Sequence, residues 1–113
     1  MNCVIVDDDV SKNILSDLIK QLNYLTLVKA CSNPLDALET LNNEKIDILF
    51  LNIEMPDMKG VELLKKIKKR PHVILTTTHV KNVFEISDLT IADYLVKPIN
   101  PSKFMQAMAK IRK

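Results

Sequence analysis

Five short apolar runs, each followed by a stretch with helical spacing, constrain the fold of this chain more than any other feature of its sequence. Each run is rich in Val, Ile or Leu, which is typical of a strand that is buried on both faces of a sheet. The third run is broken only by Asp47 and ends at a polar residue, Asn52. The five expected strands are residues 2–6, 25–31, 46–51, 73–77 and 92–96.

Between and after these runs, apolar residues recur every three or four positions, which is the spacing of one helix face. Asp9 is the expected N-cap of the first helix, and Asn33 and Asn100, each followed by proline, open the second and the last. The third helix is expected to begin near Gly60, and the fourth, over residues 81–89, has a weak pattern. The side chains expected to face the core are Val10, Ile14, Leu15, Leu18, Ile19, Leu22, Leu35, Leu38, Leu41, Val61, Leu64, Ile67, Val83, Phe84, Ile86, Phe104, Met108 and Ile111.

Strands and helices that alternate at this spacing predict right-handed strand–helix–strand units and a parallel sheet. Five strands in 113 residues fit a single α/β domain over residues 1–113, with a flavodoxin-like sheet of order 2-1-3-4-5. In that order the first and third strands are neighbours. We therefore expect the polar residues at the carboxyl ends of the strands to meet at one rim of the sheet: Asp7, Asp8, Asn52, Thr77 and Lys97.

Composition limits the class of protein. A net charge of +2 is too small to indicate nucleic-acid binding, and we expect the basic residues of 65–70 and 110–113 to be solvated helix ends. No apolar run approaches the ~20 residues of a membrane span, and residues 1–4 do not resemble a signal peptide. A cytoplasmic protein is therefore expected, in which Cys3 and Cys31 are free thiols.

The side chains expected at the rim have the chemistry of phosphoryl transfer. The adjacent carboxylates of Asp7 and Asp8 suit a hard cation such as Mg²⁺. The Lys97 ammonium can neutralise a phosphoryl oxygen, and the Thr77 hydroxyl can donate a hydrogen bond to one. The missing part is a nucleophile, because a carboxylate at position 52 could form an aspartyl phosphate, whereas the Asn52 nitrogen has its lone pair delocalised into the carbonyl.

Together these residues resemble the receiver domain of bacterial two-component response regulators, over essentially the whole chain. The matching segments are residues 6–8 with the acidic pair, 50–60 with the phospho-acceptor position, Thr77, and 94–98 with an aromatic residue and a lysine before proline. Residues 53–56 and 93–98 resemble in particular receivers fused to LytTR-type DNA-binding domains.

The resemblance implies a ligand set. Asp7 and Asp8 would hold Mg²⁺ together with the backbone carbonyl of Glu54. Lys97 would pair with the acceptor or its phosphoryl group, and its peptide bond to Pro98 would be cis, a form that is accessible chiefly before proline.

The resemblance also implies partners. Thr77 and Tyr94 would couple phosphorylation to the face formed by the fourth helix, the fifth strand and the fifth helix. A sensor histidine kinase would be the cognate partner, that face could form a homodimer, and DNA would be bound only through a domain outside this chain. No membrane partner is expected. The domain would be a signalling domain rather than an enzyme, since such domains catalyse only their own phosphoryl transfer and dephosphorylation.

The departure from the family lies at the acceptor, where this chain has Asn52 in place of aspartate. We expect no phosphorylation by the usual route and weak or absent Mg²⁺ binding, because one of three negative ligands is missing. Thr78 stands where the family usually has a smaller residue, and its bulk is expected to crowd the rim. With residue 52 neutral, the Lys97 ammonium should lie toward Asp7 or Asp8.

Three interpretations remain open. In the first, the natural protein has Asp at position 52, and Asn52 locks the domain in its unphosphorylated state. In the second, Asn52 is natural, and the domain is a phosphorylation-independent pseudo-receiver that acts as a protein-binding or dimerisation module. The third, a flavodoxin-like carrier or small enzyme, is disfavoured because no Ser/Thr/Gly-rich phosphate or flavin loop follows the first strand. The sequence alone does not separate the first two.

Overall fold

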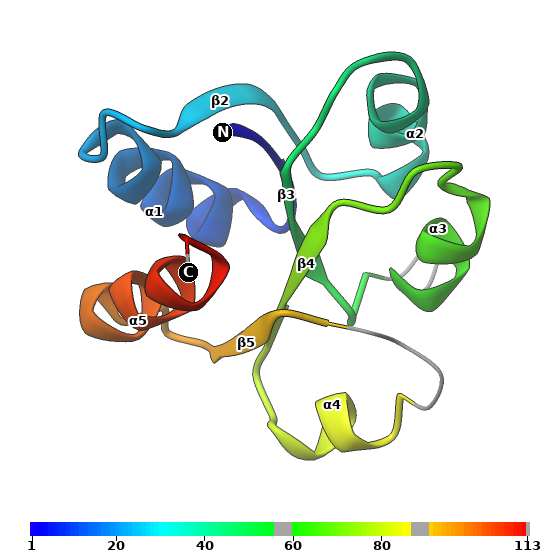
Figure 1. Ribbon diagram of the computed structural model, residues 1–113. Coiled ribbons are helices and arrows are strands. Elements are labelled where there is room, and N and C mark those ends of the chain that lie inside the picture. Colours follow the sequence, from blue (N-terminus) through cyan, green and yellow to red (C-terminus); the bar gives the residue numbers. More distant parts are fainter. Residues whose placement is uncertain (56–59, 87–90, 113) are drawn as a thin grey trace.

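The computed structural model describes residues 1–55, 60–86 and 91–112, and its centre is one parallel sheet (Figure 1). The strand order is β2-β1-β3-β4-β5, which confirms the predicted order and the flavodoxin-like class. Every neighbouring pair is parallel, and the β1–β3 pairing brings the first acidic strand end beside the third strand. The strands are β1 (Asn2–Val6), β2 (Thr26–Cys31), β3 (Ile48–Asn52), β4 (His72–Thr77) and β5 (Asp93–Val96).

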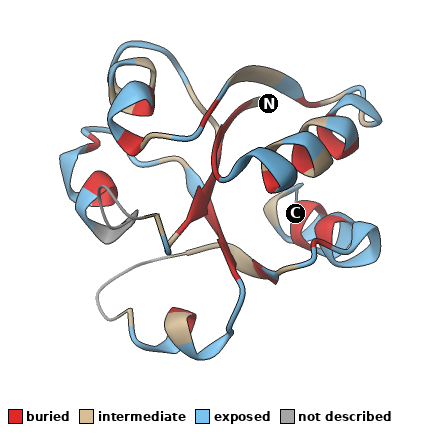
Figure 2. Ribbon diagram, turned by 180° about the vertical axis from the view of Figure 1, so that it is seen from behind, coloured by how far each residue is buried: buried red, intermediate tan, exposed pale blue. Residues whose placement is uncertain are grey.

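Helices cover both faces of the sheet, so the fold has three layers. The helices are α1 (Asp9–Lys20), α2 (Pro34–Asn43), α3 (Gly60–Lys66), α4 (Lys81–Phe84) and α5 (Pro101–Arg112). Helices α1 and α5 lie side by side on one face, and α2, α3 and α4 lie on the other (Figures 1 and 2).

The central strand β3 is buried along its whole length. Side chains on a strand alternate between faces, so Ile48 and Phe50 pack with α1 and α5, and Leu49 and Leu51 pack with the helices of the opposite face. The ring of Phe50 stacks on that of Phe104 from α5, with 5.8 Å between centroids. The buried strands appear in red at the centre of Figure 2, and this packing holds the rim on a rigid support.

The predicted N-caps agree with the structure in two of three cases. Asn33 Oδ1 accepts a hydrogen bond from Leu35 N at 2.8 Å, and Asn100 Oδ1 accepts from Ser102 N at 2.7 Å. The prediction of Asp9 as the first N-cap is wrong. Asp8 is the N-cap, because its Oδ1 accepts from Ser11 N at 2.8 Å.

Three apolar side chains that were expected in the core are exposed. Val10 is 70% exposed, because at 3.6 residues per turn it lies about 140° around α1 from the buried Leu15. Leu35 is 53% exposed on the outer side of α2, and Phe84 is 74% exposed on α4. Val10 and Leu35 lie in the first turns of α1 and α2, and Phe84 is the last residue of α4, where its ring meets that of Tyr94 on β5.

Element bounds differ from the sequence expectation by a few residues. Strand β3 begins at Ile48 instead of residue 46, and helix α4 covers only Lys81–Phe84 of the expected 81–89. Residues 87–89 of that helix, Pro56 in the acceptor segment and the side chain of Val61 lie outside the described residues. Among the helices described, none has the length and apolar content needed to cross a bilayer.

Candidate functional site

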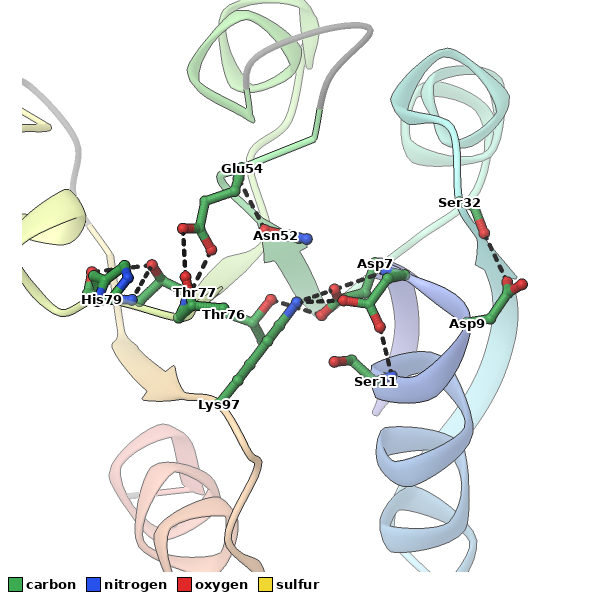
Figure 3. Close-up of polar contacts among 12 residues, drawn as sticks. Asp7, Asp9, Ser11, Ser32, Asn52, Glu54, Thr76, Thr77, His79 and Lys97 are labelled. Carbon is green, nitrogen blue, oxygen red and sulfur yellow. Dashed lines mark hydrogen bonds and ion pairs between the residues drawn. The ribbon is translucent and has the colours of Figure 1, made fainter.

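Four strand ends bring polar side chains to one rim of the sheet, as the sequence predicted (Figure 3). Asp7 and Asp8 follow β1, Asn52 is the last residue of β3, Thr76 and Thr77 end β4, and Lys97 follows β5. The carboxyl ends of parallel strands lie at the same edge of a sheet. Residues up to 90 positions apart in the chain are thus within hydrogen-bonding distance.

Asp7 is the buried centre of the rim. Its side chain has no solvent exposure, and each of its oxygens is bonded. Lys97 Nζ lies 2.6 Å from Oδ1, which also accepts from Asp8 N at 2.8 Å, and Thr76 Oγ1 donates to Oδ2 at 2.6 Å. Burial raises the pKa of Asp7, and the hydrogen bonds from Lys97 and Thr76 oppose that rise.

Lys97 joins the two acids of the β1 end. Its Nζ lies 2.7 Å from Asp8 Oδ2 as well as 2.6 Å from Asp7 Oδ1. Burial would lower the pKa of Lys97, but the two carboxylates outweigh it and raise that pKa. Burial would likewise raise the pKa of Asp8, and the Lys97 ammonium and the Ser11 N–H bring it down to about 2. Lys97 therefore lies toward the acids, as predicted, and its peptide bond to Pro98 is cis.

Asn52 is only 6% exposed and its side chain is turned onto its own loop. Its Oδ1 accepts from Glu54 N at 2.8 Å, a local turn that asparagine and aspartate favour. If residue 52 were aspartate, a carboxylate oxygen would attack the phosphoryl group. In Asn52 the side-chain oxygen belongs to an amide, and it accepts the hydrogen bond from Glu54 N.

Glu54 has a contact that the sequence did not indicate. Only its backbone carbonyl was expected to matter, yet its carboxylate accepts hydrogen bonds from Thr78 N, Thr78 Oγ1 and Asn82 Nδ2 at 2.8 to 2.9 Å. Its limited burial would raise the pKa of Glu54, but the Thr78 donors hold that pKa below its usual value. Thr78 therefore binds across the rim from β4 to the loop after β3.

The two neighbouring threonines of β4 have different roles. Thr76 faces Asp7, a contact that was not predicted, because Thr77 was singled out. Thr77 is also buried, but its Oγ1 donates to His79 O at 3.0 Å and accepts from His79 N at 3.1 Å. Successive strand residues point to opposite faces, and the pairing of Asn52 with Thr76 in the β3–β4 register identifies which hydroxyl faces the acids.

Tyr94 lies on β5, half-buried beside α4. Its ring meets that of Phe84 edge to face, with 6.4 Å between centroids and 72° between planes. Tyr94, the residue expected to act as a switch, therefore contacts α4 directly, through the solvent-exposed side chain of Phe84.

The oxygen donors of Asp7 and Asp8 are of the kind that Mg²⁺ prefers, and the Glu54 carbonyl is of the same kind. Two features of the rim distinguish it from a site with three carboxylates. Lys97 Nζ already pairs with both carboxylates, and Asn52 contributes no charge. Among the residues described, no three His, Cys, Asp or Glu side chains gather in a group that could hold a metal ion. The donor set thus fits Mg²⁺ in type, with less charge than a three-carboxylate site.

Comparison with known proteins adds independent information. Residues 3–109 match the profile of the family described as "Response regulator receiver domain". The chain is 32% identical to a protein named "Sensory transduction protein LytR" of Staphylococcus saprophyticus, over 98% of this chain and 45% of that protein. The chain spans about half the length of the curated relatives it matches.

Solved structures agree with these sequence matches. The response regulatory domain of protein mrkE from Klebsiella pneumoniae superposes with a TM-score of 0.86 at 27% identity, covering 99% of this chain and 95% of that one. The receiver domain of the sensor histidine kinase PA1611 from Pseudomonas aeruginosa PAO1 has a TM-score of 0.82 at 15% identity, covering 99% and 98%, and has a magnesium ion coordinated in its active-site cleft. At that identity the second likeness concerns the fold alone.

Proposed function

This chain belongs to the response regulator receiver domain family, and from that premise we propose that residues 1–113 form a two-component receiver that does not become phosphorylated at residue 52. The observation that carries this proposal is the position of Asn52. It stands at the end of β3, at the rim that carries Asp7 and Lys97, where the family has its acceptor aspartate, and its oxygen accepts a hydrogen bond from Glu54 N. An amide at that place offers no nucleophile for phosphoryl transfer.

The contacts of Lys97 support the same proposal. In a phosphorylatable receiver the lysine would have a charged partner at position 52. Here the ammonium is held by Asp7 at 2.6 Å and Asp8 at 2.7 Å, so Lys97 has charged partners without a charge on residue 52. Whether Asn52 is natural or replaces an aspartate of the natural gene, the chain with Asn52 would remain in the unphosphorylated state.

We propose weak Mg²⁺ binding for the same reason. Asp7, Asp8 and the Glu54 carbonyl would hold the ion, and bound Mg²⁺ would neutralise phosphoryl oxygens. To admit it, Lys97 would have to release at least one of the two carboxylates. The cost of separating a partly buried ion pair opposes binding.

A second candidate function, a phosphorylation-independent protein-binding or dimerisation module, is favoured by the face formed by α4, β5 and α5. Phe84 on α4 is 74% exposed and Val96 on β5 is 42% exposed. Large apolar side chains at the surface of a helix and a neighbouring strand are suited to a protein interface. We propose that this face forms a weak homodimer or contacts a protein partner.

The remaining partners follow from the relatives. A sensor histidine kinase in the cytoplasm would be the cognate partner of the receiver. DNA would be bound only through a further domain, since the relatives are about twice as long as this chain and include proteins named "Transcriptional regulatory protein LytR". The receiver itself would be a signalling domain and not an enzyme in the ordinary sense.

The main proposal is tested by NMR titration with Mg²⁺ and beryllium fluoride, which forms a tetrahedral stand-in for a phosphoryl group on a carboxylate. At a constant Mg²⁺ concentration, added beryllium fluoride should not change the spectra of the chain at Thr77, Tyr94 and Lys97, because Asn52 has no carboxylate to bind the beryllium. The variant Asn52→Asp, which has the same size, should show changes at all three. Equal changes in both proteins would overturn the proposal.

The second candidate is tested by sedimentation velocity over a range of protein concentrations. The chain should associate reversibly, and Phe84→Ser should abolish association. Val10→Ser removes a similarly exposed apolar side chain from α1, on the other face of the sheet, and should have no effect. A monomer at all concentrations would exclude the homodimer.

A further inference from the structure

Glu54 joins the loops that follow two neighbouring strands, β3 and β4. It lies just after β3, and its carboxylate points away from Asn52 toward the end of β4 (Figure 3). There Oε1 accepts from Thr78 N at 2.8 Å, and Oε2 accepts from Thr78 Oγ1 at 2.8 Å and Asn82 Nδ2 at 2.9 Å. One negative charge from the β3 side is thus bound by three donors from the β4–α4 segment.

The local geometry fixes the direction of this side chain. Asn52 Oδ1 accepts from Glu54 N at 2.8 Å, which closes a tight turn directly after the strand. The Thr78 N–H and hydroxyl belong to one residue, so they bind the two carboxylate oxygens as a pair. Hydrogen bonds to an ionised acceptor are stronger than those between neutral groups, although exposure to solvent at this site weakens each of them.

We propose that Glu54 is an anionic latch that fixes the conformation of the β4–α4 segment, residues 78–82, through its carboxylate. The latch needs no phosphoryl group, and it does not depend on whether residue 52 can be phosphorylated. The conformation of the segment is then set by the Glu54 contact and changes only when a binding partner displaces that carboxylate.

Asn82 connects Glu54 to two further parts of the structure. Its Nδ2 also lies 3.5 Å from Thr77 Oγ1, so the bound amide contacts the buried hydroxyl of β4. Asn82 also belongs to helix α4, which has only four residues and lacks a side-chain N-cap bond. A helix this short has little stability of its own, so its position depends on contacts such as that of Asn82.

Helix α4 in turn contacts β5. Phe84 at the end of α4 meets the ring of Tyr94 at 6.4 Å. A chain of contacts therefore runs from Glu54 through Asn82 and α4 to Tyr94. Removing the Glu54 carboxylate should therefore change the surroundings of the Tyr94 ring, although Tyr94 lies on a different strand and does not touch Glu54 directly.

Amide hydrogen exchange, measured by NMR in the absence of Mg²⁺, tests the latch. In Glu54→Ala the Thr78 N–H should exchange about 5- to 10-fold faster than in the unmodified chain, because it loses an ionised acceptor. The Tyr94 ring signals should shift as well. Glu54→Gln keeps one acceptor oxygen without the charge, so its Thr78 exchange rate should lie between those of the unmodified chain and Glu54→Ala. Glu39→Ala removes an exposed carboxylate from α2 and should leave Thr78 unchanged.

A double-mutant cycle separates the latch from a general loss of stability. Asn82→Ala and Glu54→Ala should each speed exchange at Thr78, and the double variant should be about as fast as Glu54→Ala alone, because both changes break one interaction. Independent, multiplying effects would overturn the latch, and so would a Glu54→Ala variant no different from Glu39→Ala. Neither outcome bears on phosphorylation, because residue 52 is unchanged throughout.

Discussion

Lys97 Nζ and Asp7 Oδ1 lie 2.6 Å apart, with the Asp7 side chain fully buried and that of Lys97 only 11% exposed. The two residues come from opposite ends of the chain and meet because β1 and β5 end at the same edge of the sheet. A buried carboxylate without a partner is costly, so the stability of the fold depends on Lys97 remaining paired with Asp7.

Replacing Lys97 by methionine should lower the free energy of unfolding by ~2–4 kcal/mol, because Asp7 then remains buried without its counter-charge. Urea denaturation followed by circular dichroism measures the change. The double variant Asp7→Asn/Lys97→Met should recover much of the loss, since no buried charge is left.

The matched control is Lys110→Met. Lys110 pairs with Asp93 at 3.0 Å, but its side chain is 59% exposed. Because the lysine of this pair is largely exposed and Asp93 keeps access to solvent, its removal should change the free energy of unfolding by less than ~1 kcal/mol. Equal losses in the Lys97 and Lys110 variants would contradict the buried-pair account.

Thr76→Val should destabilise the protein by ~1–2 kcal/mol, because Asp7 Oδ2 loses the hydroxyl that donates to it at 2.6 Å while the volume of the side chain is kept. Thr26→Val is the control, on an exposed position of β2, and should change stability by less than ~0.5 kcal/mol. Thermal unfolding of both variants makes the comparison. A Thr76 variant as stable as the control would mean that this hydrogen bond contributes nothing to stability.

The ion pair of Asp8 should give the protein a specific sensitivity to acid. The pKa of Asp8, about 2 in the folded state, lies below the usual value of ~3.9 in an unfolded chain. Ionised Asp8 therefore stabilises the fold above pH ~4, and that contribution is lost as the pH falls toward 2. Asp8 is half exposed, so we expect a contribution of only ~1 kcal/mol after solvent screening.

The variant Asp8→Asn isolates this effect, because asparagine is also a good N-cap and can still accept from Ser11 N. Between pH 5 and pH 2 its free energy of unfolding should fall by ~1 kcal/mol less than that of the unmodified chain. Asp17→Asn, at an exposed position of the same helix, should follow the unmodified chain. If Asp8→Asn did so too, the lowered pKa would be wrong.

The fold was predictable because its signals are redundant. The buried run that ends at Asn52, the asparagine–proline pairs at helix starts and the spacing of the core residues of α5 all point to the same alternation. An error in one signal leaves the others intact. That is why the strand order was correct although the bounds of β3 and α4 were not.

The contacts at the rim were harder to predict from the sequence, because they depend on which of several neighbouring residues of the same type makes each contact. Three consecutive acids follow β1, and each could cap a helix. Asp8 is the N-cap because its backbone is still extended, whereas Asp9 is already the first residue of α1. Two consecutive threonines end β4, and only the pairing register shows that Thr76 faces Asp7. Local sequence carries no information on either choice.

The Glu54 contact was invisible for a different reason. A glutamate side chain has several rotatable bonds and can reach many partners, so its acceptor role depends on where the β4–α4 segment lies in space. The bulk of Thr78 was noticed in the sequence, but we expected it to crowd the rim, whereas its hydroxyl and N–H bind Glu54. The position of Lys97 could be predicted, because a neutral residue 52 leaves the acids as its strongest partners.

Intact mass, measured after incubation of the chain and its Asn52→Asp variant with Mg²⁺ and acetyl phosphate, shows whether residue 52 can accept a phosphoryl group. The variant should gain the mass of one phosphoryl group, and the chain with Asn52 should gain none. A phosphoryl group gained by the unmodified chain but not by an Asn52→Ala variant would place the modification at residue 52 and contradict this prediction. A variant that stays unmodified would show that the rim cannot transfer phosphate even with an aspartate at position 52.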